Sequence, residues 1–113
     1  AWSFFEIMPE LNHNAVLGYD NPADFGERCI VIMLRSPEDH PRVQIRFDVT
    51  AELLDQRSVP HEMVWARGRS SLAHMLSVVH FGDYVSLYLA YLYETDPTPV
   101  DAIDYLKHRL AKA

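Results

Sequence analysis

Apolar residues 28–35 predict a strand. The segment RCIVIMLR is continuously apolar between its two charged ends and rich in β-branched side chains. An apolar run of this length without alternation is typical of a strand that is covered on both faces in a parallel sheet. We therefore expect an interior parallel strand over Arg28 to Arg35.

The next segment, residues 36–57, fits two patterns. Its apolar positions 43, 45, 47 and 49 alternate as in a strand, whereas positions 43, 47, 51 and 54 follow helical spacing. The length of the segment and its start at Asp39 to Pro41 favour a helix. The run VPHEMVWA, residues 59–66, then predicts a short strand, and a strand-helix-strand unit is typical of a parallel sheet.

Two further helices are expected in the last third. The segment from Ser70 to Glu94 is apolar on nearly every side, which predicts a buried helix interrupted only by Gly82. Residues 95–113 predict a second helix, with Thr98 as its cap, Pro99 at its first position and Asp101 three residues after the cap.

The N-terminal part carries weaker signals. Residues 1–7, AWSFFEI, suit a short strand, and residues 11–19, LNHNAVLGY, suit a short helix or turn because asparagine favours caps and Asx-turns. The chain starts without an initiator methionine, and we interpret it as a piece of a longer protein. The pattern as a whole predicts an α/β fold.

Composition limits the class of protein. The chain has 113 residues, of which 49% are hydrophobic, so it fits one globular domain. Its net charge is -6 and its basic residues are scattered, which excludes the basic stripe of a nucleic-acid-binding protein. We find no apolar segment of 18 residues and expect no membrane partner. The single cysteine, Cys29, can form neither an internal disulfide nor a thiolate metal cluster, which suits a cytoplasmic protein.

Several chemistries lack their motifs. HEMVW begins like a zinc-protease motif, but Trp65 stands where the second histidine belongs. The chain has no glycine-rich phosphate loop, and Ser70 and Ser71 suit a helix cap better than a nucleophile because no G-x-S-x-G elbow surrounds them. His74 and His80 are six residues apart on one helix, so they face different ways, and core histidines are commoner than metal ligands. We therefore expect no metal and no cofactor.

Three segments together resemble a known family. They are MPELNHNAVLGY, VIMLRSPEDHPRV and FGDYVSLYLAYLYETDPTPVDAIDYLKHRL. In this order they resemble the C-terminal sugar isomerase (SIS) domain of bifunctional phosphoglucose/phosphomannose isomerases over all 113 residues. The resemblance implies an α/β sandwich around a parallel sheet, and a dimer whose active site lies between domains and subunits and binds a phosphorylated sugar.

The resemblance also implies site residues. The histidine of PELNHN, here His13, would help to open the sugar ring, since an imidazole can give or take a proton at neutral pH. Lys107 would contact substrate, where its charge stabilises a developing oxyanion or binds phosphate. Asn12, Asn14 and Thr98 would bind substrate. From the residues alone, a turn residue is the better interpretation of His13, and an ordinary surface lysine is the better interpretation of Lys107.

One required group is missing from the motifs. Moving a proton between C1 and C2 of a sugar needs a base, which the resemblance assigns to a glutamate upstream of PELNHN, and Glu6 and Glu10 do not match it. The family's first domain, with its Ser/Thr-rich phosphate loop, would also lie upstream. Two hypotheses remain: part of a metal-independent aldose-ketose isomerase, or a regulatory SIS-like domain that binds sugar phosphate and dimerises without catalysis.

Overall fold

The computed structural model describes residues 5–8, 11–12, 18 and 26–112. The chain divides into two compact units, residues 2–79 and residues 80–113, and each is considered by itself. The first unit holds the sheet of the described residues and the helix that connects its strands, and the second holds the C-terminal helix.

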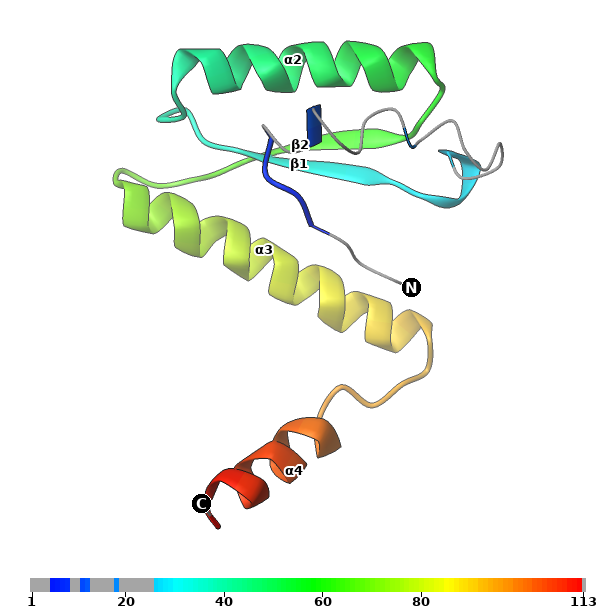
Figure 1. Ribbon diagram of the computed structural model, residues 1–113, viewed down its shortest axis with the longest axis vertical. Helices are drawn as coiled ribbons and strands as arrows, with labels where there is room; N and C mark the ends of the chain where they lie inside the picture. The colour runs from blue at the N-terminus through cyan, green and yellow to red at the C-terminus, as the bar shows by residue number, and fades with distance from the viewer. Residues whose placement is uncertain (1–4, 9–10, 13–17, 19–25, 113) are drawn as a thin grey trace. The chain divides into compact units, whose positions relative to one another are not determined.

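The centre of the first unit is a strand-helix-strand motif (Figure 1). Strands β1 (Val31–Arg35) and β2 (His61–Trp65) pair in parallel, with registers from Val31↔His61 to Arg35↔Trp65. Helix α2 (Pro41–Gln56) connects them and lies along one face of the pair. The expected α/β class with a parallel sheet is therefore confirmed.

Local signals fix both ends of α2. Pro41 occupies its first turn, and the His40 side chain caps it by accepting a hydrogen bond from the Arg42 amide at 3.2 Å. After the helix Ser58 adopts a left-handed conformation, φ 55°, and the Val59 amide donates back to the Leu54 carbonyl at 3.0 Å. The helical interpretation of this segment was thus correct, and the alternating pattern was not decisive.

The core of the described residues lies between α2 and the sheet. Leu54 is fully buried at 0% exposure. The other apolar members of the core come from α2, from β1, from the segment before β2 and from the N-terminal part: Phe47, Ala51, Met33, Val59, Met8 and Leu11. The N-terminal residues Met8 and Leu11 are thereby held against the strand-helix-strand unit.

Strand β1 differs from expectation in two respects. It begins at Val31, because residues Gly26–Arg28 form a short 3-10 helix (η3). Its side chains also alternate, with Met33 and Arg35 buried toward α2 while Ile32 and Leu34 remain 39% and 46% exposed. Among the described residues the sheet has two strands, so the expectation of an interior strand covered on both faces was wrong for this chain.

Helix α3 (Ser71–Leu92) is confirmed as a helix but is not buried. It continues through Gly82 without interruption, and among its residues only His74 is buried. At 22 residues it is long and apolar enough to cross a membrane, which corrects the expectation that no such segment exists. This statement concerns only the length and the apolar composition of the helix, and the core helix of a soluble protein can have the same length and composition.

The second unit contains α4 (Asp101–Leu110). Thr98 does not cap this helix and Pro99 is not its first residue, because the N-cap position is Val100 and makes no side-chain cap hydrogen bond. The helix therefore starts two residues later than expected. Of the strand expected over residues 1–7, residues 1–4 lie outside the described part, and residues 5–7 have no regular structure.

Candidate functional site

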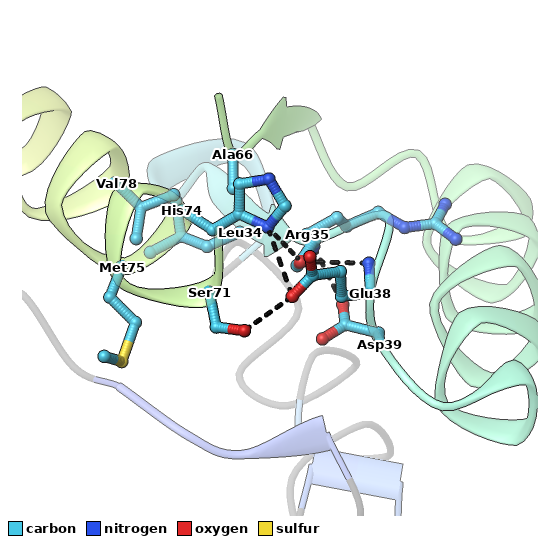
Figure 2. Close-up of a pocket in the computed structure, with 10 residues that line it drawn as sticks. Leu34, Arg35, Glu38, Asp39, Ala66, Ser71, His74, Met75 and Val78 are labelled. Atoms are coloured by element: carbon cyan, nitrogen blue, oxygen red, sulfur yellow. Dashed lines mark hydrogen bonds and ion pairs between the residues drawn. The ribbon is translucent and has the colours of Figure 1, made fainter. Parts of the chain in front are cut away.

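A cleft opens where β1 and β2 end. The carboxyl ends of parallel strands are the edge at which open α/β sheets bind ligands. The cleft has a volume of about 320 Å³. It lies between the end of β1, the turn that leads to α2 and the first turns of α3 (Figure 2). Its lining residues are Leu34, Arg35, Ser36, Glu38, Asp39, Ala66, Ser71, His74, Met75 and Val78.

His74 is one of two buried polar residues that line this cleft, and the other is Arg35. It is 7% exposed, and its Nδ1 lies 3.0 Å from the Ser36 hydroxyl oxygen. The Glu38 carboxylate lies 3.9 Å from the same nitrogen and accepts a hydrogen bond from the Ser71 hydroxyl at 2.6 Å. Figure 2 shows Glu38 from the β1–α2 turn pointing toward Ser71 and His74 from α3.

This geometry does not form a nucleophile relay. In such a relay the hydroxyl and the carboxylate contact opposite nitrogens of the imidazole. Here Ser36 and Glu38 both face Nδ1 of His74, so the carboxylate cannot orient the ring for proton transfer from the hydroxyl. The contacts instead connect the start of α3 to the β1–α2 turn. They form a cluster of four side chains: Ser36, Glu38, Ser71 and His74.

Two backbone features place the cluster. The Ser36 amide donates to the Asp39 carboxylate at 2.8 Å, which closes the turn after β1. Between β2 and α3, Gly68 has φ +136°, and a Cβ there would clash with the Cβ of Ala73. Glycine is therefore required for α3 to start this close to the end of β2.

Ser70 caps α3. Its hydroxyl accepts a hydrogen bond from the Ala73 amide at 3.3 Å, so the interpretation of this serine as a cap is confirmed. Ser71 contacts Glu38 instead.

Among the described residues, no group of three His, Cys, Asp or Glu side chains could hold a metal ion.

Asn12 contacts α2 within the first unit. Its Nδ2 donates to the Thr50 hydroxyl at 2.8 Å, and its Oδ1 accepts from Arg46 Nη1 at 3.1 Å. It does not line the cleft. The neighbouring predicted site residues His13 and Asn14 lie outside the described residues.

Thr98 and Lys107 lie in the second unit and are exposed. The Thr98 amide donates to the Asp96 carboxylate at 2.9 Å, and the amide and hydroxyl of Thr98 hold the pKa of Asp96 below its ordinary value. Lys107 Nζ lies 3.9 Å from the Asp104 carboxylate, and its side chain is 73% exposed. Three of the five predicted site residues are thus described, and in the second unit Thr98 and Lys107 contact different carboxylates, Asp96 and Asp104.

The predicted site residues do not include Ser36, Glu38 and Asp39, which line the cleft. One signal was present, because these residues directly follow a predicted parallel strand, where ligand-binding residues gather. The contact of Ser36 with His74 joins residues 38 positions apart and has no signal in the sequence.

Comparison with known proteins identifies relatives. Residues 1–110 match the family described as the bacterial phospho-glucose isomerase C-terminal SIS domain. A bifunctional phosphoglucose/phosphomannose isomerase of Caldicellulosiruptor bescii is 43% identical over 110 residues, which are 97% of this chain and 32% of the relative. Proteins of the same name from Aquifex aeolicus and Thermoplasma acidophilum are 38% and 31% identical over 97% and 96% of this chain, and over 34% and 33% of their own lengths.

The chain thus spans about a third of the length of these curated relatives. No solved structure matches it. The family match extends over nearly the whole chain and includes all three segments on which the resemblance rested. This chain therefore belongs to the family of bacterial phospho-glucose isomerase C-terminal SIS domains.

Proposed function

We propose that this chain is the C-terminal part of a metal-independent isomerase that interconverts fructose 6-phosphate with glucose 6-phosphate or mannose 6-phosphate. The observation that carries the proposal is the family match over residues 1–110, together with three relatives that bear the name of this activity. We expect the complete protein to be a cytoplasmic homodimer with a shared active site, and we expect no cofactor.

In the proposed reaction His13 handles ring opening. Opening the cyclic sugar moves a proton from the C1 hydroxyl to the ring oxygen, and one imidazole can perform both halves of that transfer near neutral pH. The open sugar then passes through an enediol, in which a proton moves between C1 and C2. The base for that second step would come from a glutamate upstream of this chain.

The remaining predicted residues bind substrate. The ammonium group of Lys107 would stabilise negative charge on a sugar oxygen or bind the phosphate, and its 73% exposure leaves it accessible. Asn14 and Thr98 would contact the substrate through their amide and hydroxyl groups. Asn12 is also a predicted substrate contact, although both polar ends of its amide already have partners on α2.

A coupled assay of the complete protein tests the proposal. Wild type should convert glucose 6-phosphate and mannose 6-phosphate to fructose 6-phosphate, with full activity in the presence of a chelator. His13→Asn keeps the side-chain size but removes the titratable group, so turnover on cyclic substrate should fall roughly 10²-fold or more. Exchange of the C2 proton, measured on substrate already in the open-chain form, should change much less.

His40→Asn is the matched control. It also replaces a histidine with asparagine, but asparagine is a good helix cap and can take over the role of His40 on α2. Its turnover should equal that of wild type. Unchanged turnover in His13→Asn would remove His13 from the mechanism. Binding of sugar phosphate without any turnover in wild type would favour the regulatory SIS-like domain.

A further inference from the structure

Both polar ends of the Asn12 amide contact helix α2. Its Nδ2 donates to Thr50 Oγ1 at 2.8 Å, and its Oδ1 accepts from Arg46 Nη1 at 3.1 Å. A guanidinium can only donate hydrogen bonds, so the oxygen of the amide has to face Arg46 and the nitrogen has to face Thr50. The two contacts together fix the orientation of the Asn12 side chain.

The Thr50 hydroxyl is itself oriented. Thr50 is 0% exposed, and its hydroxyl donates to the Arg46 carbonyl, one helical turn earlier, at 2.7 Å. A hydroxyl has one hydrogen, so this bond leaves its lone pairs free to accept from Asn12. Thr50 thus presents a fixed acceptor at the point where the N-terminal segment contacts α2.

Packing alone does not explain a hydroxyl at this position. Valine has the same shape as threonine and a similar helix propensity, and it would bury its second methyl group without a polar cost. The hydroxyl is useful here because it binds Asn12. Met8 and Leu11, each 8% exposed, pack in the same core, so the segment that ends at Asn12 is held by apolar and polar contacts together.

We propose that Arg46 and Thr50 are positioning residues that act through Asn12 on His13, the next residue in the chain. This inference rests on the proposed function, in which His13 opens the sugar ring. Consecutive Cα atoms are about 3.8 Å apart, so fixing Asn12 restricts where the imidazole can be placed. In this assignment Asn12 acts by holding the chain, and this role replaces the substrate contact that the resemblance implies for it.

Thr50→Val in the complete protein tests the inference. A displacement of about 1 Å can cost about 10²-fold in rate, and a partial loss of position should lower kcat on cyclic sugar phosphate by about tenfold. The KM should change little, because the substrate contacts remain. Exchange of the C2 proton on open-chain substrate should be spared, and Thr50→Ser, which keeps the hydroxyl, should retain the wild-type rate.

A double variant separates positioning from general damage. If Thr50 acts through His13, then Thr50→Val should cause no further loss of turnover when it is added to His13→Asn. Additive losses, or an equal loss on open-chain substrate, would overturn the inference while leaving the proposed function intact. A raised KM with unchanged kcat would also overturn it, because it would show that Asn12 contacts substrate. Wild type without turnover would overturn both.

Arg46→Met provides an independent test if Thr50→Val does not fold. This variant removes the other contact of Asn12, the hydrogen bond from the Arg46 guanidinium. It should lower kcat as Thr50→Val does, and it should cause no further loss of turnover when it is added to His13→Asn. Arg42→Met is its control, because Arg42 lies about one turn earlier on α2 and its side chain is exposed. The control should keep the wild-type rate, and an equal loss in both variants would contradict the inference.

Discussion

Arg35 at the end of β1 and Asp48 on α2 form an ion pair, with Nη1 of Arg35 2.6 Å from Oδ1 of Asp48. The guanidinium is 5% exposed, also donates to the Gln44 carbonyl at 3.2 Å, and stacks over the ring of Trp65 at 4.5 Å. Its Nε is buried without a hydrogen-bond partner among the described residues. Arg35 therefore joins β1, α2 and β2 at the edge of the sheet where the cleft opens.

Asp48→Asn should weaken this junction. The change removes the negative charge that balances a buried guanidinium, but Asp48 is 58% exposed, so water compensates in part. We expect the free energy of opening of β1 and α2 to fall by about 1–2 kcal/mol, as measured by native-state hydrogen exchange of their amides in the complete protein. Asp55→Asn, on the same helix and 75% exposed, should cost less than about 0.5 kcal/mol. Equal effects of the two changes would contradict this account.

The Ser36–His74 hydrogen bond should hold α3 against the β1–α2 turn. Ser36→Ala leaves Nδ1 of the buried His74 without this hydrogen bond, and His74→Leu leaves the Ser36 hydroxyl with the Glu38 amide as its remaining partner. Each change should lower the free energy of unfolding by about 1–3 kcal/mol. The double variant should cost less than the sum, because the pair is then replaced by apolar groups.

Hydrogen exchange of the 36–39 turn and the first turn of α3 measures this coupling. Ser86→Ala is the control, since Ser86 is an exposed serine of α3 whose hydroxyl donates to the Asp83 carbonyl. It should leave exchange at the 36–39 turn unchanged. Strictly additive losses for Ser36→Ala and His74→Leu would show that the observed contact contributes no coupling.

The Asp96 carboxyl should titrate below its ordinary range. The Thr98 amide is the larger cause and the Thr98 hydroxyl the smaller, since both donate to the ionised carboxylate. Thr98→Val removes the hydroxyl alone, so it should raise the pKa of Asp96 only part of the way to its ordinary value. The carboxyl carbon shift in a selectively labelled sample, followed by NMR from acid to neutral pH, measures both values.

The sign of the accompanying stability change follows from the lowered pKa. Because the folded state holds the ionised carboxylate more strongly, any contribution of Asp96 is present above its unfolded-state pKa and is lost as the pH falls through the folded-state value. Thr98→Ser, which keeps the hydroxyl, should leave the titration close to that of wild type. A full return of the pKa in Thr98→Val would contradict the dominance of the backbone amide.

The elements predicted correctly are those whose signals are local. Pro41 and the preceding polar residue define the start of α2, and the strand-helix-strand order fixes parallel pairing without any knowledge of tertiary contacts. The start of α4 was misplaced, because Thr98 resembles a cap, but its amide and its hydroxyl both bind the Asp96 carboxylate. Thr98 can either cap the helix or bind Asp96, and the sequence does not show which of the two it does.

Burial depends on groups that local patterns do not include. The apolar composition of α3 correctly predicts a helix, but whether its apolar side chains are covered depends on what packs against them. Tyr84, Tyr88 and Tyr91 are 48%, 61% and 62% exposed in this chain. Similarly, no pattern in the sequence pairs Asn12 with Arg46, because this contact joins segments 34 residues apart.

Lys107 and Lys112 offer the last test, because they are the two lysines of the chain and both lie near its C-terminal end. If Lys107 supplies positive charge to the substrate, then Lys107→Met should lower kcat/KM for both sugar phosphates by roughly 10²-fold, because a charge-assisted contact in the transition state is lost. Lys107→Arg keeps the charge but not the shape of the group, so it should recover only part of the rate. Lys112→Met is the matched control and should keep the wild-type kcat/KM. Equal rates for Lys107→Met and Lys112→Met would show that Lys107 is an ordinary surface lysine whose only described partner is Asp104.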